Sequence, residues 1–153
     1  MLYHIYFIFC FFACGYTKKN GEISYNNEKS THQDMQILNE ALAKDSLKVY
    51  FREWVIEEGD AGSFQALDEN YAKDKNRVYY CREYRDGQSY YLTKKVEITV
   101  LEKAQTANFQ SLGNGYAKDN QNAFYKGVSF KVRDISSLKV ISQPLKSIQQ
   151  FDC

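Results

Sequence analysis

An internal repeat constrains the fold of this chain more than any other feature of its sequence. The segment Phe64–Tyr80 aligns without gaps with Met35–Phe51 and with Phe109–Tyr125, and each of these matches it at 8 of 17 positions. A glutamine, a leucine and the tripeptide Ala-Lys-Asp are the same in all three copies. A motif that recurs in this way indicates an array of similar units, each of which buries its apolar side against a neighbour.

Each copy predicts a short helical turn followed by a β-hairpin. An apolar residue followed three residues later by leucine, as in Met35 and Leu38, shares one face of a helical turn. The aspartate of Ala-Lys-Asp opens a turn between two strand-forming segments. The predicted fold is therefore mainly β, with tandem hairpins in a 29-residue unit. An α+β fold with a longer first helix is the alternative, because residues 35–44 are largely good helix formers.

The repeat domain is predicted to cover residues 35–141. A truncated fourth copy starts at Leu138, with Leu138 and Ile141 at its first two apolar positions. The step from the second copy to the third is 45 residues, so we expect an insertion of 16 residues that forms a projecting hairpin over about residues 85–100. Residues 142–153 are expected to form a C-terminal tail.

The middle copy reads YAKDKNRVYY over residues 71–80, and residues 119–125 form a degenerate version of it. This motif resembles the signature of the bacterial DKNYY repeat family. The first copy departs from it, with Ser46-Leu47 where the motif has Lys-Asn. The resemblance extends over residues 35–141 and implies a secreted or envelope protein. It supplies no catalytic residue.

The N-terminus is predicted to be a lipoprotein signal peptide over residues 1–13. An apolar run from Ile5 to Phe12 is too short to span a bilayer, and Ala13 directly precedes Cys14, which resembles a bacterial lipoprotein box. Cleavage before Cys14 would leave it as the lipid attachment site, carrying chains such as palmitate; Cys10 follows the large Phe9 and fits less well. An ordinary cleaved signal of a secreted protein is the alternative. Residues 14–34 are polar and predict a flexible tether.

Composition excludes several classes of function. The net charge is +1, from 20 basic and 19 acidic residues, which does not favour nucleic acid as a partner. After processing, His32 is the remaining histidine, so a Ser-His-Asp nucleophile system or a multi-histidine zinc site is hard to assemble. The Gly113-Asn114-Gly115 segment lacks the strand and helix context of a phosphate loop. We therefore expect no cofactor and no metal.

Carboxylates occur in two patterns that have a structural and a functional interpretation. Asp45, Asp74 and Asp119 recur once per unit and either bind calcium in a row or, as we favour, shape their own hairpins. Glu57, Glu58 and Asp60 either form a glycosidase-like pair of carboxylates or a solvated loop, and we favour the loop.

Aromatic residues and cysteines supply the remaining candidates. Tyr79 and Tyr80 are adjacent on a strand and must face opposite sides, so one side could expose an aromatic contact surface. Trp54 aligns with Val128 and is expected to fill the core. Cys81 and Cys153 form a candidate disulfide in an oxidising compartment.

The sequence thus predicts a non-catalytic envelope lipoprotein that acts as a binding or structural module. Its partners would be a membrane, through the lipid anchor, and a protein or a glycan. One alternative is a carboxylate-dependent hydrolase of envelope glycans that uses residues 57–60 and the insertion. Another is an immunity or antagonist protein that contacts one partner through the insertion.

Overall fold

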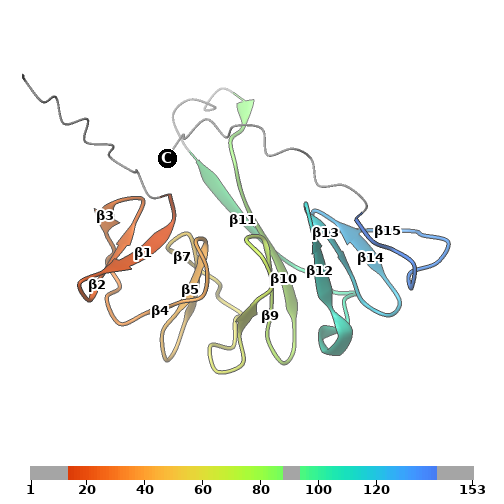
Figure 1. Ribbon diagram of the computed structural model, residues 1–153, viewed down its shortest axis with the longest axis horizontal. Helices are drawn as coiled ribbons and strands as arrows, with labels where there is room; N and C mark the ends of the chain where they lie inside the picture. The colour runs from red at the N-terminus through yellow and green to blue at the C-terminus, as the bar shows by residue number, and fades with distance from the viewer. Residues whose placement is uncertain (1–13, 88–93, 141–153) are drawn as a thin grey trace, which may run out of the picture.

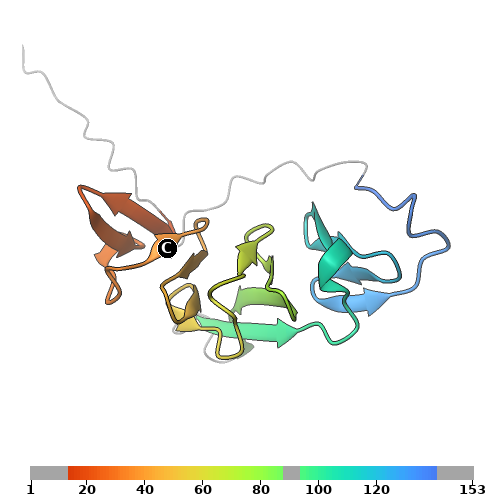
Figure 2. The same ribbon diagram turned by 90° about the horizontal axis from the view of Figure 1, so that it is seen from below.

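Four antiparallel β-sheets lie side by side in the order of the chain in the computed structural model, which describes residues 14–87 and 94–140 (Figure 1). The first sheet has three strands and each of the others has four, always in a meander in which neighbours in sequence are neighbours in space. Figure 2 shows the same row from below, with the first sheet at one end and the fourth at the other. The molecule is therefore an open array.

The sheets are built from short strands. The first contains β1 (Tyr16–Lys19), β2 (Glu22–Tyr25) and β3 (Glu28–Lys29); the second contains β4 (Gln36–Ile37), β5 (Leu42–Lys44), β6 (Val49–Phe51) and β7 (Trp54–Val55). The third contains β8 (Gln65–Ala66), β9 (Tyr71–Lys73), β10 (Val78–Tyr84) and β11 (Lys95–Val100). The fourth contains β12 (Gln110–Gly113), β13 (Tyr116–Lys118), β14 (Ala123–Tyr125) and β15 (Val128–Phe130), after one 3-10 turn, η2 (Thr106–Asn108).

The predicted hairpins are present in all three copies and share one register. Leu42 pairs with Phe51, Tyr71 with Tyr80, and Tyr116 with Tyr125. Both residues of each pair lie on the same side of their sheet. In the second and third sheets, this is the side that packs against the next sheet along the chain. The mainly β, repeat-like part of the fold prediction is therefore confirmed.

The helical turn that was predicted before each hairpin is replaced by a short strand. Among the described residues there is no α-helix, so the alternative with a longer first helix is also wrong, and residues 35–44 form β4 and β5. The reason lies in the cores. Phe64 packs towards the second sheet, whereas Leu67, three residues later, packs towards the fourth. The two apolar residues, three positions apart, therefore pack into cores on opposite sides of their sheet and do not share one face of a helix.

A fourth hairpin occupies the segment that was predicted to be a tether. Tyr16 pairs with Tyr25, and Asn26 N–H donates to the Gly15 carbonyl, as Arg52 N–H does to the Ala41 carbonyl in the second sheet. Residues 16–29 thus form a degenerate copy of the repeat, and the tether prediction is wrong for them. Tyr16 and Ile23 stabilise it because both are buried against the second sheet.

Each interface between sheets has its own apolar core. Between the first two sheets the buried residues are Tyr16, Ile23, Met35, Ala43 and Tyr50. The core between the second and third sheets includes Leu42, Phe51, Phe64, Ala72 and Tyr79, and the next includes Tyr71, Tyr80, Phe109, Ala117 and Phe124. Equivalent positions recur in each core, which is the nearest-neighbour packing of a repeat protein.

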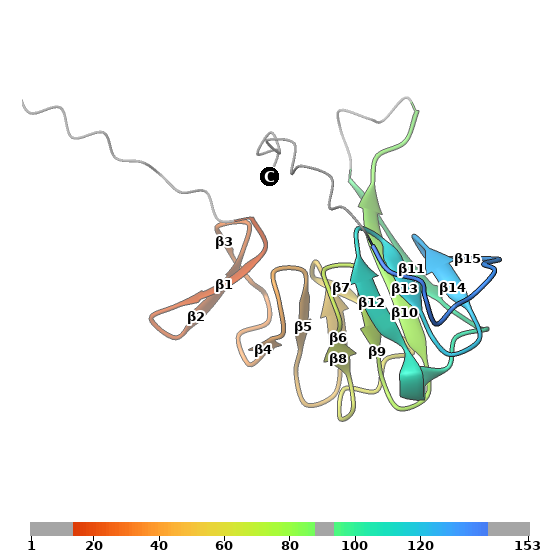
Figure 3. The ribbon, with the colours of Figure 1, turned by 45° about the vertical axis from the view of Figure 1, so that its right-hand side comes forward.

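The predicted insertion forms the long hairpin of β10 and β11, which rises above the neighbouring sheets (Figure 3). In the second sheet a two-residue left-handed turn, Arg52-Glu53, joins the last two strands. In the third sheet the strand continues instead through Cys81, which pairs with Ile98. The insertion therefore replaces a tight turn with a ladder; residues 88–93 lie outside the described part of the chain.

Candidate binding surfaces

The repeated aspartates shape the hairpins in which they lie. Asp74 accepts hydrogen bonds from Asn76 N–H and Arg77 N–H, both at 2.7 Å, and Asp45 and Asp119 make the same pair of bonds within their own turns. The other oxygen of Asp74 accepts a bond from the hydroxyl of Tyr79 at 2.7 Å. The three carboxylates thus accept hydrogen bonds from backbone N–H groups and, in Asp45 and Asp74, from a tyrosine hydroxyl. Among the described residues, no group of three or more histidines, cysteines and carboxylates has the geometry of a metal site.

These hydrogen bonds set the charge state of the buried aspartates. Burial alone would favour the neutral acid, but four hydrogen bonds, from Asp60, Tyr79 and the turn, outweigh it and lower the pKa of Asp74. Asp119 shows the same balance, with the bond from Gln105 N–H as the largest opposing contribution to a lowered pKa. Both side chains are therefore ionised at neutral pH inside the array.

The lysine of each Ala-Lys-Asp motif fixes the start of the next unit. Lys44 Nζ donates to carbonyls 17 and 20 residues later, and Lys118 Nζ does so at the same separations. Lys73 reaches a carbonyl 33 residues later, which is 16 more and equals the predicted insertion. Lys118 bonds to the carbonyl of Leu138 as Lys44 bonds to that of Phe64, the first residue of the second copy. Leu138 therefore lies where a fourth copy would start. Ile141 lies outside the described residues.

The carboxylates over residues 57–60 are held by surface contacts. Glu58 forms an ion pair with Arg77 at 3.1 Å, and its carbonyl accepts a hydrogen bond from Arg77 Nη1. Asp60 accepts bonds from the Ser63 hydroxyl and N–H, and the hydroxyl bond is the main cause of its lowered pKa. A general acid needs a raised pKa, so Asp60 does not suit that role.

Tyr79 and Tyr80 divide between two cores, as the strand geometry predicts. Tyr79 contacts the second sheet and Tyr80 the fourth, and both are buried. Trp54 does not fill the core as expected, because β7 is an edge strand and 60% of the side chain is exposed. Its predicted equivalence with Val128 holds, since each pairs with the last residue of the preceding strand.

The cysteines differ from the predicted pairing. Cys81 is a free, fully buried thiol, and burial raises its pKa to about 12. The predicted disulfide between Cys81 and Cys153 is therefore wrong, because Cys81 is a free thiol. Cys153 lies outside the described residues.

The Gly113-Asn114-Gly115 segment is a tight turn between β12 and β13. All three residues have positive φ, of 83°, 54° and 78°, which glycine and asparagine adopt readily.

His32 lies beside Tyr50, with ring centroids 4.6 Å apart. Neither feature is placed as a catalytic or phosphate-binding group would be.

A groove of about 330 Å³ runs between the long hairpin and the fourth sheet. We call it the hairpin groove. Arg82 and Glu97 face each other across β10 and β11 at 2.5 Å, and Tyr125 and Lys126 come from the fourth sheet on the other side. Its volume lies at the lower end of the range of small-ligand sites, which combine aromatic walls with a few polar groups. The step between repeats predicts the insertion, but no local pattern in the sequence marks any of these four residues.

The outer face of the fourth sheet adjoins this groove and is apolar. It consists of Tyr116, Tyr125, Val128 and Phe130, which line a hollow of about 290 Å³. Tyr125 is 41% exposed, Val128 69% and Phe130 36%. The hollow and the hairpin groove share Tyr125 and Val128, so the two form one continuous surface.

Comparison with known proteins places the chain in a family. No curated protein and no solved structure matches it. Within the described residues, no helix is long and apolar enough to cross a membrane. The sequence profile of the DKNYY family matches residues 3–84, more than half of the chain. This range ends in β10 and includes the first hairpin as well as the middle copy. The chain belongs to the DKNYY family.

Proposed function

We propose that this protein is a non-catalytic binding module of the bacterial cell envelope, and that the hairpin groove holds its ligand. The observation that carries the proposal is the groove itself: the insertion alone breaks the repeat, and it rises beside the fourth sheet to form one wall. A connection that departs from a repeat scaffold is where a binding site is expected.

The groove fits a ligand with both apolar and polar groups, such as an envelope glycan or a protein segment. Tyr125 supplies an aromatic surface next to Lys126, whose ammonium lies 5.4 Å from the ring centroid. The Arg82 and Glu97 side chains are about half exposed, so both can exchange their ion pair for bonds to a ligand. Affinity would then come from aromatic contact and orientation from the charges.

A lipid anchor at Cys14 fits the same function. The first sheet starts two residues later, at Tyr16, so an acyl chain on Cys14 would hold the array directly at a membrane surface. Labelling cells with a palmitate analogue tests this: wild type should be labelled and Cys14→Ala should not. Secretion without a lipid is the other outcome.

Capture by paired variants tests the groove. Tagged mature protein is incubated with a solubilised envelope fraction from its own cells, and the bound glycan and protein are identified by mass spectrometry. Arg82→Ala/Glu97→Ala should lose at least ten-fold in capture. Glu57→Gln/Glu58→Gln should capture as wild type does, because these residues do not line the groove. Hydrolysis of the glycan by wild type that this second pair abolishes would instead establish the hydrolase.

A further inference from the structure

The outer face of the fourth sheet carries the same residues that the first and third sheets bury. In each of these sheets two tyrosines face each other across the hairpin, with ring centroids 4.9 Å apart for Tyr16–Tyr25 and for Tyr71–Tyr80. Tyr116 and Tyr125 form the same pair at 4.5 Å. The first two pairs are covered by the following sheet, whereas Tyr125 is 41% exposed.

The covered pairs show what kind of surface fits on such tyrosines. In each case the following sheet contributes a large apolar residue, an alanine and an aromatic residue. The set on Tyr71 and Tyr80 is Phe109, Ala117 and Phe124; the set beside Tyr16 and Tyr25 is Met35, Ala43 and Tyr50. The alanine and the aromatic residue are cross-strand partners in both sets, so one hairpin presents both.

A hydrogen bond accompanies this packing. The Tyr71 hydroxyl accepts a bond of 3.0 Å from Gly127 N–H, and the Tyr16 hydroxyl accepts one of 2.7 Å from Glu53 N–H. Both donors are the second residue of a left-handed turn in the following sheet. In the described part of the chain, the equivalent hydroxyl of Tyr116 has no hydrogen-bond partner.

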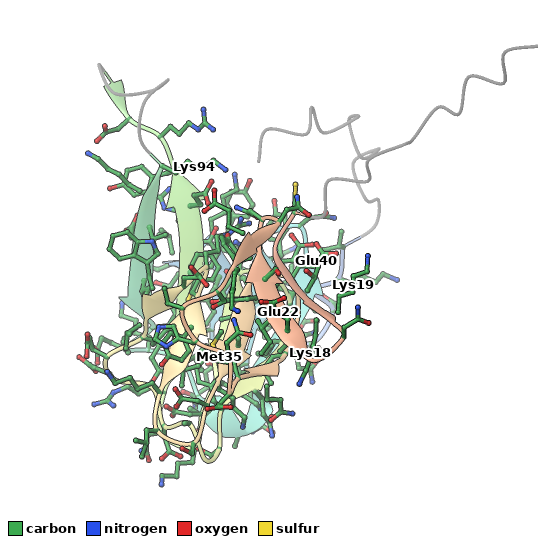
Figure 4. The ribbon with its side chains drawn as sticks, turned by 90° about the vertical axis from the view of Figure 1, so that its left-hand side faces the viewer. Lys18, Lys19, Glu22, Met35, Glu40 and Lys94 are labelled. Atoms are coloured by element: carbon green, nitrogen blue, oxygen red, sulfur yellow. The ribbon has the colours of Figure 1, made fainter. Side chains whose placement is uncertain are left out.

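Neither a second copy of the chain nor the sequence of its own C-terminus supplies the matching residues. At the other end of the array, the cross-strand pair in the alanine and aromatic positions is Thr17 and Ser24, both polar. Figure 4 shows that end, where the charged residues Lys18, Lys19 and Glu22 lie on the first sheet. Continuing the repeat register past Leu138 puts Lys146 and Cys153 at the same two positions.

We propose that the outer face is a docking surface for one further sheet of the same repeat type, supplied by a second polypeptide whose first hairpin retains the alanine and the aromatic residue. That hairpin covers Tyr116 and Tyr125, and its turn donates an N–H to the Tyr116 hydroxyl. The inference rests on the proposed function as a binding module and specifies a partner class at a surface next to the groove.

A donor made from the chain itself tests the fit. Thr17→Ala with Ser24→Tyr gives the first sheet the pair found in the third sheet, and Tyr125→Lys in the same chain disables its own outer face. Mixed with wild type, this donor should form a 1:1 complex in sedimentation velocity. The association should be at least ten-fold tighter than any self-association of wild type. A donor that remains folded by circular dichroism and forms no such complex would overturn the proposal.

Variants of the acceptor identify the face. Tyr125→Lys in the acceptor should abolish the complex, Tyr116→Phe should weaken it several-fold through loss of the hydroxyl, and Leu47→Lys, an exposed residue of the second sheet, should bind as wild type. Self-association of wild type that Tyr125→Lys abolishes would assign the face to a second copy instead. Tighter donor binding by a chain ending at Val140 would assign it to the C-terminus. Either result overturns the proposal. Groove capture with Arg82→Ala/Glu97→Ala tests the proposed function separately, because neither of these residues lines the outer face.

Discussion

At the scale of single residues, close contacts between neighbouring sheets fix the array. Gly127 has a φ of 79°, and a Cβ there would lie 2.8 Å from the ring of Tyr80. The glycine therefore allows a turn of the fourth sheet to pack flat on a ring of the third. Alanine at residues 43, 72 and 117 has the same effect, since each is fully buried between sheets.

Replacing Gly127 by alanine should destabilise the protein by about 1–3 kcal/mol more than replacing Gly113 does. Both glycines have φ near +80°, so both variants carry the strain of a left-handed alanine, about 1 kcal/mol. Only Gly127 has a neighbouring ring, because nothing lies within 4 Å of a Cβ on Gly113. Urea unfolding of the two variants measures the difference, and equal values would show that the ring moves aside without cost.

Asp74 should make stability depend on acid. Its pKa is lowered on folding, so its contribution is present above its unfolded pKa of about 4 and is lost as the pH falls through the folded value. Asp74→Asn should cost about 1–3 kcal/mol at pH 7, because Tyr79 and Asp60 N–H lose their acceptor, and less at pH 3. Urea titrations at both pH values check this. Glu69→Gln, at an exposed carboxylate, is the control: it should lose as much stability between pH 7 and pH 3 as wild type does.

At the scale of elements, the third sheet differs from its neighbours because a strand continues where they turn. A tyrosine hydroxyl in the first and third sheets accepts the turn N–H of the following sheet. The second sheet has Leu42 at that position, and the following sheet has the ladder of Cys81 and Ile98 instead of a turn. Leu42, which has no hydroxyl, thus faces a sheet that has no turn N–H to donate at this position.

Shortening the long hairpin should therefore be compensated by one substitution. Deleting residues 82–97, with Cys81→Asn and Ile98→Gly to form a two-residue turn, removes the side chains of Cys81, Val96 and Ile98 from the core. We expect a loss of about 2–4 kcal/mol from these side chains. Adding Leu42→Tyr should recover about 1 kcal/mol by accepting the new turn N–H. Thermal unfolding of the two shortened chains measures this; no gain from Leu42→Tyr would contradict the equivalence.

At the scale of the whole molecule, the sheets depend on their neighbours. Each core is shared by two sheets, and strands of two to seven residues cannot form a core within one sheet. The two ends differ: the first sheet presents polar residues outwards, as a terminal cap does, whereas the fourth presents tyrosines.

Loss of the first sheet should spread to the second. Ile23→Asp places a charge at a fully buried position between them and should unfold the first hairpin. Met35, Ala43 and Tyr50 then lose their cover, so amide exchange should accelerate in β5 and β6 more than in β13 and β14. Hydrogen exchange with mass spectrometry reports each sheet. Lys18→Asp, exposed on β1, is the control, and uniform acceleration would contradict nearest-neighbour coupling.

Much of this architecture follows from the sequence, because residues that make local contacts leave a local pattern. The Ala-Lys-Asp tripeptide predicted the hairpins, since aspartate bonds to N–H groups only two and three residues away. The step of 45 residues predicted the insertion. The first hairpin was also marked, by Asn20-Gly21 between two tyrosines, but its low similarity to the other copies hid it.

The tertiary structure decided which side of each unit meets which neighbour. Met35 and Leu38 have helical spacing, yet they lie in different cores, and only the stacking of sheets separates them. The stacking of sheets also buries Cys81 in the core between the second and third sheets, as a free thiol. The hairpin groove and the outer face arise between or at the end of units. Their residues are far apart in sequence or repeat positions that are buried elsewhere, so no local pattern distinguishes them.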